Sequence, residues 1–144
     1  MVWRFGGVLC ALLVAVPAWA GPVGTIKNVS GAASIQRGSD KVAAIAGGEV
    51  QQSDVIVTGA DGSVGLTLRD NTTLSVGPAT TMALDEFAFE PADNNLKLVT
   101  SLARGTMMMT SGTIAKLAPE KVSVVTKTGT IGVRGTRFVV SVSE

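Results

Sequence analysis

Short runs of apolar and β-branched residues recur along the chain from Gly24 onward, and each run ends at Gly, Asp, Asn or Pro. The clearest run is Ser63–Arg69, where Val64, Leu66 and Leu68 alternate with small or polar residues, as in a half-buried strand. Runs of this kind at intervals of about eight to twelve residues predict an all-β domain. Strands are predicted at Thr25–Val29, Ala32–Arg37, Val55–Thr58, Ser63–Arg69, Thr72–Val76, Thr80–Leu84, Thr106–Thr110 and Lys121–Thr126.

Three stretches between these strands have less regular patterns. Val42–Ala46 is rich in alanine and ambiguous, whereas Leu96–Ala103 fits a strand or a short helix, and its neighbours favour the strand. Asp85–Asn95 is acidic at both ends and contains Phe87 and Phe89, which predicts a surface loop pinned by two rings. Arg104-Gly105 predicts a turn before three methionines that alternate between the two faces of a strand, as in core packing.

The stretch Thr126–Ser141 carries three glycines at a spacing of three, separated by β-branched residues, two arginines and one phenylalanine. This pattern predicts two short strands joined by a corner that the glycines shape and that holds Arg134. We expect Arg134 to brace the corner by bonding backbone carbonyls or a carboxylate such as Asp54 or Asp70, and a contact with a ligand or partner is the alternative.

The repetition of strands and turns has no strict period, which argues against a long solenoid. The prediction is therefore a compact β-roll or a small β-helix-like sandwich of short strands. An immunoglobulin-like sandwich is the main alternative, but the chain beyond residue 20 has neither tryptophan nor tyrosine for that fold's usual core.

Residues 1–20 have the layout of a secretory signal peptide: one positive charge at Arg4, an apolar run, and a small-x-small site at Ala18–Ala20. Cleavage is expected between Ala20 and Gly21. An uncleaved membrane anchor is the second interpretation, although the apolar run is shorter than the ~20 residues that a spanning helix needs. Lipidation at Cys10 is a third.

Removal of residues 1–20 leaves a chain without Cys, Trp, Tyr or His and with eleven Lys+Arg against eleven Asp+Glu. Triads that need His or Cys are excluded, and only a serine–lysine arrangement at Ser111 and Lys116 remains formally open. A neutral balance argues against nucleic-acid binding. The aspartates Asp61, Asp70 and Asp93 lie in separate turns, so we expect no metal site, no cofactor and no catalysis.

The segment Thr128–Phe138 resembles the ending of FecR domains, in which a glycine and aliphatic residues precede Arg-Gly-Thr-x-Phe. Gly48–Gly59 and Leu66–Leu74 resemble two earlier segments of that family, with Asn71 where glycine is usual. Leu84–Phe87 and Ser111–Lys116 resemble a periplasmic subgroup of it. The resemblance implies one FecR-like domain over residues 24–142.

The best-known relatives carry a membrane span before this domain and relay signals from an outer-membrane receptor to a cytoplasmic sigma factor. Here we expect only a leader before the domain, so the resemblance implies an exported binding or signalling module in the periplasm or envelope of a Gram-negative bacterium. Its partner would be an envelope protein, such as a receptor or membrane regulator, or a surface polymer. A scaffolding role without signalling is the alternative. The contact residues suggested are Gly132, Arg134, Gly135, Thr136, Phe138, Phe87 and Phe89.

Overall fold

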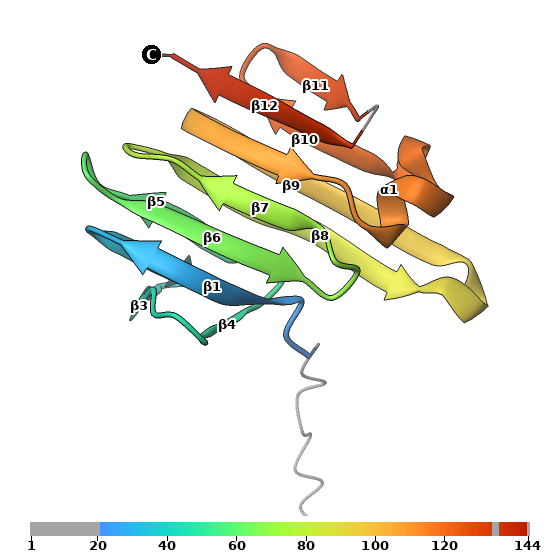
Figure 1. The fold of residues 1–144 in the computed structure, drawn as a ribbon, viewed down its shortest axis with the longest axis horizontal. Coiled ribbons are helices and arrows are strands. Elements are labelled where there is room, and N and C mark those ends of the chain that lie inside the picture. Colours follow the sequence, from blue (N-terminus) through green and yellow to red (C-terminus); the bar gives the residue numbers. More distant parts are fainter. Residues whose placement is uncertain (1–20, 134–135, 144) are drawn as a thin grey trace, which may run out of the picture.

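The computed structural model describes residues 21–133 and 136–143, so the predicted signal peptide lies outside the described residues. The described part consists mostly of β-strands, which confirms the predicted all-β class (Figure 1). Its strands are β1 (Gly24–Ser30), β2 (Ala33–Arg37), β3 (Asp40–Ala43), β4 (Glu49–Val50), β5 (Val55–Thr58), β6 (Ser63–Leu68), β7 (Thr73–Val76), β8 (Thr81–Glu90), β9 (Asn95–Thr110), β10 (Val122–Thr126), β11 (Gly129–Gly132) and β12 (Arg137–Val142). A short helix, α1 (Thr113–Leu117), and two 3-10 turns, Pro91–Asp93 and Pro119–Lys121, complete it.

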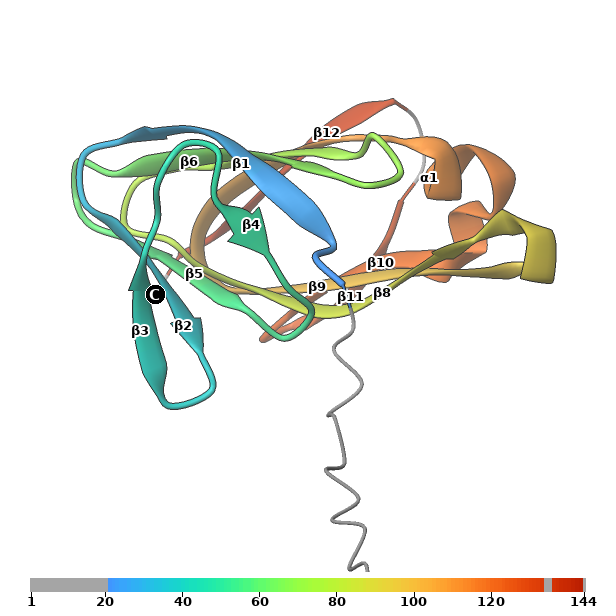
Figure 2. The ribbon, with the colours of Figure 1, turned by 90° about the horizontal axis from the view of Figure 1, so that it is seen from below.

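The strands form one curled sheet whose two halves face each other, as Figure 2 shows. The first half has the order β4-β1-β6-β7-β9-β12, and the second has the order β3-β2-β5-β8-β9-β10-β11. Neighbouring strands are antiparallel except β9 and β10, which are parallel. The sheet as a whole is curled into a half-barrel.

The long strand β9 belongs to both halves of the sheet. Up to Arg104 it pairs with β8 and β10, and from Gly105 onward it pairs with β7 and β12. The predicted turn at Arg104-Gly105 is therefore wrong, because the chain bends there without leaving the sheet. Gly105 has a φ of 94°, and a Cβ at this position would lie 2.6 Å from the Cα of Thr80. Only glycine fits this bend without strain.

The corners at which the chain crosses between the halves stack on one another. The N–H of Gly59 donates to the carbonyl of Ala32, and the N–H of Ala79 donates to the carbonyl of Gly59 (both 2.8 Å). The N–H of Thr106 continues the series by donating to the hydroxyl of Thr80 at 3.1 Å. Because hydrogen bonding runs through the corners, this end of the half-barrel has few unpaired backbone groups.

The core lies between the two halves and is built by alternation along the strands. In Ser63–Leu68 the residues Val64, Leu66 and Leu68 are buried, as the period of two predicts. Met107 and Met109 are also fully buried while Met108 is not, which confirms the alternation predicted for the three methionines. Further core side chains are Ile26, Ile35, Ile56, Leu74, Met82, Leu84, Leu98, Leu102 and Val124.

The surface loop predicted at Asp85–Asn95 is wrong, because this segment forms the second half of β8, the turn after it and the first residue of β9. The two strands stay paired as far as Glu90 and Asn95, and only a 3-10 turn at Pro91–Asp93 separates them. The hairpin projects beyond the rest of the sheet (Figures 1 and 2). Leu96–Ala103, in contrast, is part of strand β9, as its neighbours predicted.

Candidate binding groove between β11 and β12

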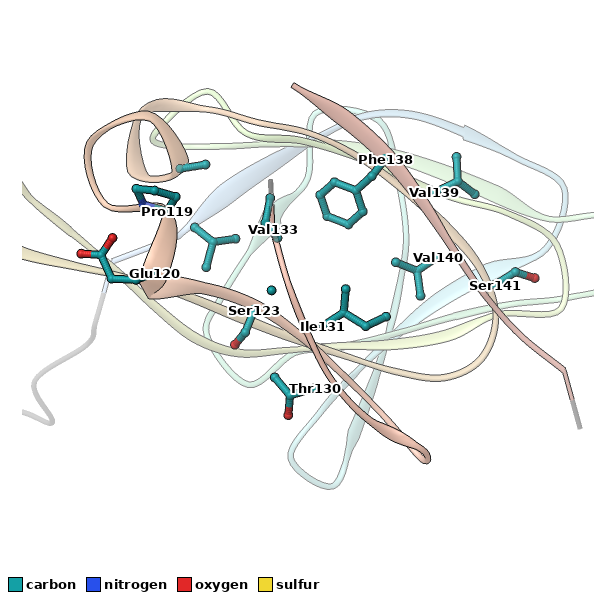
Figure 3. Close-up of a pocket in the computed structure, with 13 residues that line it drawn as sticks. Pro119, Glu120, Ser123, Thr130, Ile131, Val133, Phe138, Val139, Val140 and Ser141 are labelled. Atoms are coloured by element: carbon teal, nitrogen blue, oxygen red, sulfur yellow. The ribbon is translucent and has the colours of Figure 1, made fainter. Parts of the chain in front are cut away.

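The two halves of the sheet separate at the edge formed by β11 and β12, where they leave a groove of about 1330 Å³ (Figure 3). We call it the C-terminal groove. It is lined by Ala115, Pro119, Glu120, Val122, Ser123, Thr130, Ile131, Gly132, Val133, Phe138, Val139, Val140 and Ser141. Most of this lining belongs to Thr126–Ser141, the stretch that carries the glycine-rich motif.

Local pairing explains why the two strands diverge. The strand β11 forms a hairpin with β10 and extends the second half of the sheet, with Ile131 opposite Val124. The strand β12 instead pairs with the far part of β9, with Phe138 opposite Met109, and extends the first half. The two strands predicted within Thr126–Ser141 are confirmed, but they belong to opposite faces of the molecule.

Both strands have one unpaired edge within the described residues, since β11 pairs there only with β10 and β12 only with β9. The carbonyl of Thr136 accepts a hydrogen bond from the N–H of Ser111, so the backbone polar groups of Thr136 point toward the chain that continues β9. In an antiparallel ladder the bonded residues alternate, so Arg137, Val139 and Ser141 direct their N–H and C=O groups away from β9. These groups are available to another strand.

The groove has an apolar interior whose side chains are only partly covered. Val133 and Val140 are buried, at 4% and 6% exposure, and Ile131 is 39% exposed, whereas Val139, at 60% exposure, lies on the face of β12 opposite to Phe138 and Val140. Phe138 is half-buried and extends from β12 into the groove, as Figure 3 shows. Among the described residues of the lining, Glu120 is the single charged one. Such a surface favours an apolar partner over a small polar ligand.

The structure brings together some of the contact residues suggested by the sequence. Gly132 and Phe138 both line the C-terminal groove, and Thr136 is exposed immediately before β12. Arg134 and Gly135 lie outside the described residues. The corner itself thus stays a prediction, although the strands on both sides of it are described.

Phe87 and Phe89 lie elsewhere, on β8 in the projecting hairpin. Phe87 is 7% exposed and belongs to the core, and Phe89 is half-buried against it. The guanidinium of Arg69 lies 5.4 Å from the centre of the Phe87 ring, which places a cation over the aromatic face. The rings cover one end of the core, and a contact with a partner through them stays a prediction.

The two carboxylates suggested as partners of Arg134 already bind other groups. Asp54 is 1% exposed, and Arg37 donates to it from Nε at 3.0 Å and from Nη2 at 2.8 Å. The hydrogen bond to Asp54 raises the pKa of Arg37, while desolvation opposes the rise. The carboxylate of Asp70 is fully buried and accepts from the N–H and hydroxyl of Thr72 and from the N–H of Ile114.

Asp70 therefore has the turn role predicted for it, and it also ties α1 to the turn between β6 and β7. Asn71, the residue that replaces the family's usual glycine, has a φ of 69°. Asparagine tolerates this left-handed geometry, so the turn forms without glycine.

The sequence analysis missed the apolar residues of the groove, above all Ile131, Val133, Val139 and Val140. Their signal was present as alternation, since Phe138, Val140 and Val142 occupy one face of β12 and Val139 occupies the other. Alternation alone could not show that the groove between these strands is open.

The described part of the chain has neither a cluster of metal-ligating side chains nor a helix that could span a membrane. No three His, Cys, Asp or Glu side chains gather there as potential metal ligands. Among those residues there is also no helix with both the length and the apolar character that a membrane crossing requires.

Comparison with known proteins agrees with the resemblance seen in the sequence. The family model described as FecR protein matches residues 54–144. No curated protein and no solved structure matches the chain. The family is a regulatory and signalling one, is associated with the cell envelope, and is not known for catalysis. Because the match spans more than half of the sequence, this chain belongs to the FecR family.

Proposed function

We propose that this protein is an exported, non-catalytic binding module that acts in signalling in the envelope of a Gram-negative bacterium. Its functional part would be the domain at residues 24–142, released from a signal peptide at residues 1–20. One observation carries the proposal: an open apolar groove, flanked by two strands with unpaired edges, lies at the family's motif segment.

The proposed mode of contact is strand addition. A partner segment in extended conformation would bond to the free N–H and C=O groups of an edge strand and place alternate side chains over the groove. Burial of Ile131 and Val139 would add apolar stabilisation at about 25 cal/mol per Å² of surface removed from water. The backbone bonds would position the partner, and the groove would select its side chains.

The test is site-specific photo-crosslinking in living cells with the full chain. A photoreactive amino acid replaces Ile131 or Val139 in the groove. As a matched control it replaces Ala43, an exposed residue on the edge strand β3. We expect the same membrane receptor or regulator to be captured from both groove positions and not from Ala43.

The identity of the captured molecule separates the two candidate roles. A receptor or membrane regulator supports signalling, whereas a surface polymer or a large exported structural protein supports the scaffolding alternative. Equal capture from Ala43 and from the groove positions, or capture from Ala43 alone, would contradict the groove as the binding site.

A further inference from the structure

We infer that the partner segment at the C-terminal groove is acidic and adds to the free edge of β12. This inference rests on the proposed function and specifies the chemistry of the partner. It is carried by the distribution of charge in the molecule, which is strongly uneven although the chain beyond residue 20 is neutral overall.

The segment that builds the groove is basic. Residues 113–144 contain five Lys and Arg but only two acidic residues, Glu120 and Glu144, a net charge of +3. Residues 21–112 contain six Lys and Arg and nine Asp and Glu, a net charge of −3. The groove and its surroundings therefore attract negative charge, while the rest of the molecule repels it.

The positive charges lie at both ends of the groove and are exposed. Lys127 lies in the turn between β10 and β11, whereas Lys121 and Arg137 lie at the opposite end, beside α1. Lys116 is on α1 itself. Within residues 21–133 and 136–143 none of these four side chains has an ion-pair partner. Their charge is thus available to a partner.

The geometry favours β12 over β11 as the strand that receives the partner. The strand β12 offers the free N–H and C=O groups of Arg137, Val139 and Ser141, and Val139 presents an exposed apolar side chain between them. The strand β11 is shorter, and glycine occupies both of its ends. An extended segment that pairs with β12 would pass directly by Arg137. We therefore expect the partner segment to carry acidic residues next to its apolar residues.

The experiment uses the purified exported protein and labelled peptides of defined sequence. The probe alternates valine and threonine and carries glutamates at both ends. A matched peptide carries lysines in place of the glutamates, and a third has proline in the middle, which cannot continue a ladder of hydrogen bonds. Fluorescence anisotropy gives affinities, and amide NMR shifts show which strand is contacted.

We expect the acidic probe to bind at least about tenfold more tightly than the lysine peptide, with affinity falling as salt is raised. Its binding should shift the amides of Arg137, Val139 and Ser141 more than those of β11. The double variant Lys127→Glu/Arg137→Glu should lose about tenfold in affinity for the acidic probe. The matched variant Lys27→Glu/Lys41→Glu, which changes two exposed lysines outside the basic segment, should lose much less.

The outcomes separate this inference from the proposed function. Equal binding of the acidic and lysine peptides at the groove overturns the acidic partner but leaves strand addition intact. Shifts confined to β11 overturn the choice of β12. If neither peptide shifts groove amides while the protein self-associates through its two oppositely charged regions, the groove binds a second copy and the inference is wrong.

Discussion

The two long edges of the half-barrel differ in whether the gap between the halves of the sheet is covered. At the edge formed by β3 and β4 the gap is covered by the connection between those strands, and at the edge formed by β11 and β12 the described residues leave an apolar groove. Both edges end in short strands, so strand length does not explain the difference.

The β3–β4 edge is closed by specific contacts. Ile26 of β1 donates its N–H to Gly48 at 2.8 Å and accepts at its carbonyl from Gly47 at the same distance, which holds the connection against the sheet. Arg37 on β2 binds Asp54 and also donates to the carbonyl of Glu49 on β4, so it bridges the two halves. The edge strands themselves carry Asp40, Lys41 and Glu49, charges that discourage pairing with other chains.

The β11–β12 edge lacks these features in the described residues. Strand β12 reads Arg-Phe-Val-Val-Ser-Val, with one charge at its start, and β11 carries none. One edge of this protein is protected by charges and a half-buried ion pair, and the other presents apolar strands. This asymmetry suits binding rather than stability. The comparison thus supports the proposal of the groove as a binding surface on grounds that do not depend on the family.

The largest effect is expected from the glycine in the bend of β9, compared with Gly132 at the edge of the groove. Gly105→Ala should lower the free energy of unfolding by at least about 3 kcal/mol, because its positive φ and the nearby Cα of Thr80 leave no room for a methyl group. Gly132→Ala should be neutral or stabilise by up to about 0.5–1 kcal/mol, since no atom lies within 4 Å of the added carbon. Urea denaturation measures both.

A loss of stability in Gly132→Ala comparable with that in Gly105→Ala would show that the groove edge is closed in solution. Similar stability of both variants and the original protein would instead contradict the tight corner at Gly105 and the continuous strand β9.

The next largest effect concerns the ion pair that closes the β3–β4 edge. Arg37→Ala leaves the buried carboxylate of Asp54 without its cation and should cost about 2–3 kcal/mol, somewhat reduced because Arg37 is partly exposed. The control is Lys97→Ala, which removes an ion pair of similar length to Glu86 in which both side chains are about half exposed. That change should cost less than about 1 kcal/mol. Equal losses in thermal unfolding would contradict the closing role of Arg37.

Much of the fold could be predicted from the sequence because alternation survives wherever pairing is regular. Ser63–Arg69 and Met107–Met109 show this, since their buried positions follow a period of two. Asp85–Asn95 was misread because a β-bulge between Leu84 and Glu86 shifts the register. Buried positions change there from Met82 and Leu84 to Phe87, so the period is interrupted and the strand resembles a loop.

The groove could be predicted only in part for a related reason. The motif Thr128–Phe138 marks the segment, and its composition predicts two strands. Which distant strand each one pairs with depends on contacts far apart in sequence: β11 follows β10, whereas β12 returns to β9. That choice opens the groove, and no local pattern encodes it.

The smallest effect on folding, and a sharp test of the open edge, is expected from Val139→Lys. Val139 is 60% exposed, so the change should alter the free energy of unfolding by no more than about 0.5 kcal/mol. A lysine on a strand edge discourages pairing with another strand, as charges do on β3 and β4, so crosslinking from Ile131 should be lost. Val139→Thr, which keeps a β-branched side chain, should retain it. The lysine also adds a positive charge that would attract an acidic partner. Loss of crosslinking from Ile131 would therefore show that apolar burial at β12 outweighs this attraction. Full retention of crosslinking would place the partner away from this strand.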